Sequence, residues 1–166
     1  MTLADFTKPG LIVPHLRARD ATGAIHELSL VMQREGGVPD WLPFYHEALN
    51  REFLLSTDME AGMAFPHARL AGLKELVFAF GRSDEAFAWG PEVTHRVRLV
   101  FLLAVPVGDS GRYLPLVSGL ARLSAAHPLL DRVFGAAGPD EIMVAFRQVA
   151  LHDHPVPAAP AGAGAR

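Results

Sequence analysis

The stretch Val97-Arg98-Leu99-Val100-Phe101-Leu102-Leu103-Ala104-Val105 decides the fold, because it is nearly all apolar. A strand with one solvent-exposed face alternates apolar and polar residues, whereas a continuous apolar run is typical of a central strand covered on both faces. The longest apolar stretch, Leu99–Val107, is far too short to span a bilayer, which needs about 20 residues as a helix. The sequence therefore predicts a buried central strand and no membrane insertion.

Further strands and helices are predicted around this central strand from apolar periodicity, capping residues and turn residues. The expected strands are Leu11–Val13, Met63–Phe65 and Glu75–Gly81, and the expected helices are Asp20–Arg34, a segment capped by Asp40 with an apolar stripe through Phe53, Arg112–Ala126, Pro128–Phe134 and Pro139–Ala150. A mixture of strands and helices around one strongly buried strand indicates a three-layer α/β/α domain.

Composition and charge narrow the function classes. The 166 residues fit one domain, and the formal net charge of −3 gives no argument for nucleic acid or anionic membranes. The chain has no cysteine, which fits a reducing compartment, and Met1–Lys8 lacks the layout of a secretory signal. We therefore expect a cytoplasmic domain over residues 1–151, followed by a disordered tail rich in Pro, Ala and Gly at 152–166.

The block Gly62-Met63-Ala64-Phe65-Pro66-His67-Ala68-Arg69 places a histidine directly after a proline that ends a short apolar run. We expect His67 at a strand end, with one ring nitrogen open to solvent in a shallow pocket. Imidazole is a ready nucleophile or base near neutral pH. Taken alone, the block also fits a surface or core histidine without chemistry.

Three blocks of sequence, in one order, resemble a known family. They are Arg51-Glu52-Phe53-Leu54-Leu55-Ser56-Thr57, the proline-histidine block, and the central apolar stretch through Pro106. They are similar to the enzyme IIA domain of the fructose/mannitol class of the bacterial phosphoenolpyruvate-dependent phosphotransferase system, a class that includes the nitrogen-regulatory enzyme IIA. The resemblance covers about Leu11–Val149 and implies a mixed β-sheet between helical layers.

The resemblance also implies a function. In this family the histidine accepts a phosphoryl group from the phosphocarrier protein HPr or its nitrogen-system counterpart, and passes it to an enzyme IIB domain or holds it as a regulatory mark. His67 occupies that position, Arg51 matches the family arginine, and Ser56-Thr57 matches a common hydroxyl pair. Arg69 is a candidate for holding the phosphoryl group or docking a partner. Such transfer depends on positioning and charge, so neither a metal nor an organic cofactor is expected.

Two positions depart from the family pattern. Tyr113 stands where the family usually has a second histidine near the first, and a phenol donates a hydrogen bond but cannot become cationic. The loop before the motif, Asp58-Met59-Glu60-Ala61, carries two carboxylates that would oppose a phosphate where nitrogen-regulatory members tend to have glycines. Both departures leave open a non-catalytic binding module that has kept the fold and lost efficient phosphotransfer.

Other readings have less support. A hydrolase that uses His67 as a base would need a serine or cysteine nucleophile motif, and none is evident. His152-Asp153-His154 has the look of a metal pair, but in a flexible tail it is expected to be solvated. The sequence identifies neither the sugar nor the regulated target.

Overall fold

Strand β6 (Arg96–Pro106) is the centre of the fold, as the apolar stretch predicts. The computed structural model describes residues 1–54, 58–91, 96–109 and 111–152. The other strands are β1 (Ile12–Val13), β2 (Asp58–Met59), β3 (Met63–Ala64), β4 (His67–Leu70) and β5 (Val77–Ala88). The helices are α1 (Ala21–Arg34), α2 (Trp41–Leu54), α3 (Tyr113–Ala125), α4 (His127–Gly135) and α5 (Pro139–Phe146), with 3₁₀ turns η1 (Leu3–Phe6), η2 (Pro9–Leu11) and η3 (Glu60–Gly62).

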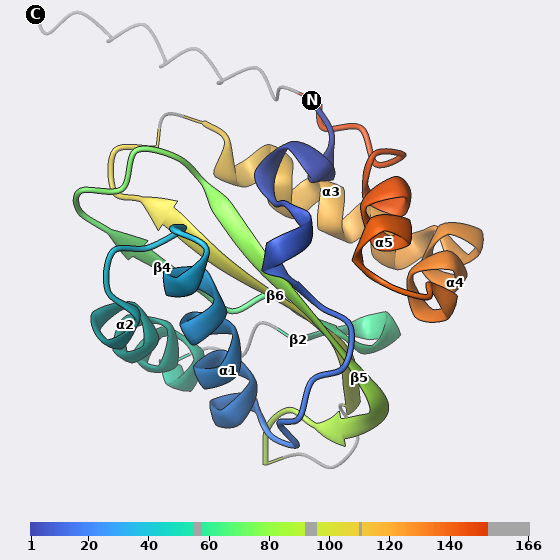
Figure 1. Cartoon of the computed structure of the whole chain (residues 1–166), viewed down its shortest axis with the longest axis horizontal. Coiled ribbons are helices and arrows are strands. Elements are labelled where there is room, and N and C mark those ends of the chain that lie inside the picture. The colour runs from blue at the N-terminus through green and yellow to red at the C-terminus, as the bar shows by residue number, and fades with distance from the viewer. Residues whose placement is uncertain (55–57, 92–95, 110, 153–166) are drawn as a thin grey trace, which may run out of the picture.

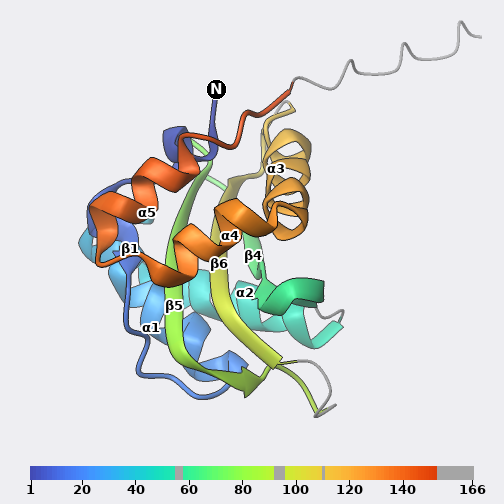
Figure 2. The same ribbon diagram turned by 90° about the vertical axis from the view of Figure 1, so that its right-hand side faces the viewer.

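The six strands form one mixed sheet in the order β1-β5-β6-β3-β2, with β4 also paired to β6. β6 runs antiparallel to β5 and parallel to both β3 and β4. Helices α1 and α2 lie on one face of the sheet, and α3, α4 and α5 lie on the other (Figure 1; Figure 2). The predicted three-layer α/β/α architecture with a mixed sheet is confirmed.

Side chains of β6 alternate between two apolar cores, one on each face of the sheet. Leu99, Phe101, Leu103 and Val105 belong to the core with residues of α3, α4 and α5, whereas Val100, Leu102 and Ala104 belong to the core with residues of α1 and α2. All seven side chains are fully buried. Because successive residues of a strand point to opposite faces, only an unbroken apolar run satisfies both cores.

Capping residues fix the first two helices close to their predicted bounds. The Asp20 carboxylate accepts a hydrogen bond of 2.7 Å from the backbone N–H of Gly23 at the start of α1. α1 ends at Arg34, and Gly36 follows with φ of 78°, a conformation that glycine adopts without steric cost. Asp40 accepts from the backbone N–H of Leu42 at 3.1 Å and so caps α2.

The structure differs from the predicted elements most clearly at β4, β5 and α5, and the short strand β2 was not predicted either. Strand β4 has no counterpart among the predicted strands, because it is only four residues long and follows a proline. β5 runs on to Ala88 rather than ending at Gly81, through a polar segment with a register shift between Arg82 and Phe87. α5 ends at Phe146 and not at Ala150, so that Ala150 forms a bridge with Thr2.

The buried arginine Arg82 explains how β5 continues through its polar segment. Its Nε donates to the carbonyl of Pro14 at 3.1 Å. Its Nη1 donates to the carbonyls of Val133, Phe134 and Ala136 at 2.9, 3.2 and 2.8 Å. These three carbonyls lie at the C-terminal end of α4, where the helix dipole favours a cation. Arg82 thus connects the middle of β5 to the C-terminal end of α4.

The two ends of the domain meet beside the sheet. The backbone N–H of Leu3 donates to the carbonyl of Val149 at 3.1 Å, and that of Leu151 donates to the carbonyl of Met1 at 2.8 Å. The predicted tail lies outside the described residues, apart from His152.

Within the described ranges, every helix is too short or too polar to cross a membrane.

Candidate functional site

A break between two strands sets the position of His67. β3 ends at Ala64, and Pro66, which has no N–H, accepts a hydrogen bond of 2.9 Å from the backbone N–H of Leu103 in β6. β4 then begins at His67, which pairs with Leu103. His67 is therefore the first residue of β4 and not the last residue of the strand before it. Alternation along β4 places His67 on the α3 face and Ala68 on the α1–α2 face.

The hydrogen bonds of the His67 ring assign its tautomer. Nδ1 lies 3.3 Å from the carbonyl oxygen of Phe65. A carbonyl only accepts, so Nδ1 carries the proton and donates it. Nε2 is then an unprotonated acceptor, and it receives a hydrogen bond of 3.3 Å from the hydroxyl of Tyr113. The arrangement leaves the nucleophilic lone pair on Nε2.

Tyr113 reaches His67 because it is the first residue of α3. Its backbone N–H donates to the Asp109 carboxylate at 2.9 Å, which holds the start of the helix. The two rings have centroids 5.4 Å apart and are tilted by 48°. The Arg69 guanidinium carbon lies 5.2 Å from the centroid of the same phenol ring, within cation–π range. His67, Arg69 and Tyr113 thus form one connected group.

The charge state of His67 follows from its surroundings. Burial lowers the pKa of His67 below 6.5, and the positive charges of Arg51 and Arg69 lower it further. The hydrogen bond to the Phe65 carbonyl and the negative charge of Glu52 act in the opposite direction. Burial also raises the pKa of the Tyr113 hydroxyl. At neutral pH the pair is a neutral imidazole and a neutral phenol.

The sequence predicted that one ring nitrogen of His67 would be open to solvent, and this prediction is wrong. The residue is only 7% exposed. The Phe65 ring stacks beside the imidazole, with centroids 6.3 Å apart and planes 10° apart, and the Tyr113 hydroxyl engages Nε2. Polar neighbours nonetheless remain in contact with the ring, so the site differs from a histidine enclosed by apolar side chains alone.

Arg51 approaches the site from the opposite layer. It lies in the last turn of α2, and its charge acts on both His67 and Tyr113. The next residue, Glu52, accepts a hydrogen bond of 2.7 Å from the indole N–H of Trp89, which is itself buried. Sequence reasoning overlooked Glu52, although its place directly after Arg51 could have indicated it.

Part of the predicted site lies outside the described residues. Ser56 and Thr57 fall in this category, so their proposed role in phosphoryl binding stays a prediction. In the loop that follows, Ala61 has φ of 66°, in the left-handed region that favours glycine. Gly62 follows with φ of 71°. The backbone at Ala61 and Gly62 therefore adopts a conformation that glycine takes without steric cost.

Comparison with known proteins agrees with this architecture. Residues 5–149 match the family described as phosphoenolpyruvate-dependent sugar phosphotransferase system, EIIA 2. The 2-O-alpha-mannosyl-D-glycerate-specific EIIABC component of Escherichia coli is 31% identical over 151 residues, which is 88% of this chain and 22% of that relative. The chain thus spans about a fifth of the length of that relative.

Two further proteins are similar along most of their own length. The nitrogen regulatory protein of Bradyrhizobium diazoefficiens is 30% identical over 128 residues, covering 74% of this chain and 80% of the relative. A solved complex of the Escherichia coli mannitol enzyme IIA with phosphorylated enzyme IIB has the same fold, with a TM-score of 0.71 at 17% identity, over 85% of this chain and 98% of that one. The chain belongs to the EIIA 2 family of the phosphoenolpyruvate-dependent sugar phosphotransferase system.

Proposed function

We propose that the protein accepts a phosphoryl group on Nε2 of His67 from an HPr-type phosphocarrier, and transfers it onward or holds it as a regulatory mark. The observation that carries this proposal is the Nδ1 hydrogen bond to the Phe65 carbonyl. It commits the proton to one nitrogen and the lone pair to the other. A lowered pKa of His67 keeps that lone pair free at neutral pH.

The proposed step is a displacement at phosphorus. The Nε2 lone pair forms the new N–P bond while the N–P bond of the donor's phosphohistidine breaks, and the donor nitrogen keeps the bonding electrons. The Nδ1 proton stays in place, and its hydrogen bond to Phe65 stabilises the positive charge that the ring acquires. Onward transfer is the same step in reverse, with an acceptor side chain as the nucleophile.

Neighbouring side chains fit the charge changes of this step. Tyr113 must turn its hydroxyl from Nε2 to a phosphoryl oxygen, where it donates to a charged acceptor and forms a stronger bond. Arg69 is held beside that phenol, and Arg51 contributes positive charge from α2. Guanidinium groups suit phosphoryl oxygens because their N–H groups form a planar fork. These groups supply positioning and charge without a metal or an organic cofactor.

A partner protein must dock over this group of residues to reach Nε2. Two large apolar side chains, Val107 and Leu114, are 61% and 63% exposed on the segment around the start of α3. The mannitol enzyme IIA in the solved complex binds phosphorylated enzyme IIB. For this chain we propose an HPr-type donor and, as acceptor, an enzyme IIB domain or a regulated target protein. This role places the chain in the cytoplasm.

A second candidate function is a binding module that keeps the fold without phosphotransfer. The observation in its favour is that the Tyr113 hydroxyl occupies Nε2 by a hydrogen bond, in a site where His67 is only 7% exposed. If the phenol does not turn away, the donor cannot reach the lone pair.

Labelling with phosphate separates the two functions. The intact chain is incubated at neutral pH with enzyme I, labelled phosphoenolpyruvate and an HPr-type carrier. Phosphotransfer predicts incorporation that His67→Ala abolishes and His127→Ala, a change at an exposed histidine of α4, leaves intact. Absence of label on the wild type with every carrier supplied supports the binding module, and label that survives His67→Ala contradicts both functions.

A further inference from the structure

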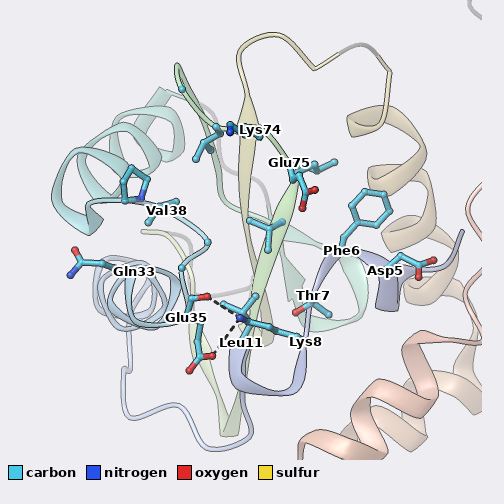
Figure 3. A pocket seen from close by; sticks show the side chains of 17 residues that line it. Asp5, Phe6, Thr7, Lys8, Leu11, Gln33, Glu35, Val38, Lys74 and Glu75 are labelled. Carbon is cyan, nitrogen blue, oxygen red and sulfur yellow. Dashed lines mark hydrogen bonds and ion pairs between the residues drawn. The ribbon is translucent and has the colours of Figure 1, made fainter.

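A cavity of about 750 Å³ lies apart from the His67 site, and its size fits a small-molecule ligand. It is bounded by the N-terminal segment from Asp5 to Leu11, the end of α1 with the loop from Gln33 to Pro39, and the loop from Gly72 to Val77 (Figure 3). None of the residues that line it belongs to the group around His67. The proposed phosphotransfer leaves this cavity unexplained.

The floor of the cavity is apolar. Four of its lining residues, Phe6, Leu11, Val38 and Leu76, are buried members of the two hydrophobic cores. A ligand that lies against this floor meets apolar side chains there, and a polar group placed on the floor would lose its hydrogen bonds to water.

The rim of the cavity carries charges of both signs. On one side, Lys8 donates to the backbone carbonyl of Glu35 at 2.9 Å and lies 3.7 Å from its carboxylate, so these two charges are matched to each other. On the other side are Lys74 and Glu75 (Figure 3). Across the described residues, neither Lys74 nor Glu75 has a hydrogen bond or ion pair. One ammonium and one carboxylate, adjacent in sequence, thus remain available to a ligand.

Two further polar features lie on the wall of the cavity. The C-terminal end of α1 faces the cavity through Gln33 and Glu35, and the Lys8 ammonium already lies at this helix end, which favours a positive charge. The Thr7 hydroxyl oxygen on the wall is buried, and it has no hydrogen-bond partner in the part of the chain that the structure describes. Rotation by one staggered position about χ1 exchanges this hydroxyl with the methyl group and makes it a possible ligand contact.

We propose that this cavity binds a zwitterionic α-amino acid with a large apolar side chain. The side chain lies on the floor formed by Phe6, Leu11, Val38 and Leu76. The ligand ammonium pairs with the Glu75 carboxylate, and the ligand carboxylate pairs with the Lys74 ammonium. Such a site would add small-molecule sensing to the domain, and it is independent of whether His67 is phosphorylated.

The test is isothermal titration calorimetry of the intact chain with L-phenylalanine as the probe. Two comparison ligands each lack one charge: 2-phenylethylamine has no carboxylate, and 3-phenylpropanoate has no ammonium. Each should bind about tenfold more weakly than L-phenylalanine, because each loses one charge-assisted pairing. Lys74→Met and Glu75→Gln should weaken L-phenylalanine binding by a similar factor. Glu85→Gln, which changes an exposed carboxylate of β5 far from the lining, is the matched control and should leave binding unchanged.

Several outcomes would overturn the proposal. One is no binding heat with L-phenylalanine at concentrations up to about 10 mM, a range that captures even weak millimolar binding. Another is equal affinity for L-phenylalanine and either comparison ligand, which would show that the site does not bind both the ammonium and the carboxylate of the amino acid. A third is an equal loss of binding in Glu85→Gln and Glu75→Gln. Because both rim residues are exposed, their substitution should leave folding intact, and a thermal melt of each variant checks this.

Discussion

Replacing Arg82 with methionine should destabilise the domain strongly, since methionine keeps the apolar stem and removes the guanidinium. The side chain makes four hydrogen bonds of 2.8 to 3.2 Å to backbone carbonyls. Those to Val133 and Ala136 are buried, and a buried carbonyl that loses its donor costs about 1–3 kcal/mol. Relief from burying the guanidinium charge offsets part of this sum. We expect a net loss of about 3 kcal/mol in the free energy of unfolding.

Differential scanning calorimetry measures this loss. For a chain of this size, 1 kcal/mol corresponds to about 2–4 °C in the melting temperature, so Arg82→Met should melt about 6–12 °C lower. Amide hydrogen exchange in α4 should accelerate most, because its C-terminal carbonyls lose their shared donor. Arg147→Met, at an exposed position with the same change of side chain, is the control and should shift stability by less than about 0.5 kcal/mol. A melting temperature of Arg82→Met equal to that of Arg147→Met would refute the reasoning.

Three further predictions concern the site and the loop that precedes it. Tyr113→Phe should lower the phosphorylated fraction in the labelling assay about fivefold, because a hydrogen bond to a charged phosphoryl oxygen is worth about 1 kcal/mol more than one to a neutral nitrogen; a rise would show that the phenol only blocks Nε2. The His67 ring should titrate by NMR with a midpoint below 6.5, because burial lowers its pKa. The free energy of unfolding should fall as the pH drops from 6.5 through this midpoint, since the unfolded chain binds the proton more readily over that range. A midpoint above 6.5 contradicts the burial argument. Ala61→Gly should raise the free energy of unfolding by about 0.5 kcal/mol, as relief of left-handed strain exceeds the added entropy of the unfolded chain, and a lower melting temperature would count against it.

Local sequence signals were sufficient for the central strand and for the positions of the helices, although not for the end of α5. Asp20 and Gly36 bracket α1 because capping and left-handed turns depend on neighbouring residues only. β6 follows from an unbroken apolar run. The extension of β5 through Arg82 could not be predicted, because the carbonyls that bind Arg82 come from residues about fifty positions later.

The site was predictable in part for the same reason. The proline-histidine block marked His67 directly, whereas Tyr113 was connected to it only through the family resemblance, and the structure places its hydroxyl 3.3 Å from Nε2. The burial of His67 was missed because it arises from the Phe65 ring and from α3, a helix that begins more than forty residues later. The apolar periodicity of the sequence does not indicate that residues so far apart in the chain will bury the imidazole.

The pairing pattern of the sheet has a consequence for the order in which the chain acquires its structure during synthesis. β4, which begins with His67, has β6 as its strand partner, and β5 separates the two along the chain. While residues up to Ala88 have been made, the backbone of His67–Leu70 lacks that partner, and parallel pairing of such distant segments is slow to form. Tyr113 is made later still. The imidazole therefore gains its hydrogen bond to Tyr113 only after the central strand has been made, so the His67–Tyr113 pair is assembled after, and not before, the strand that pairs with β4.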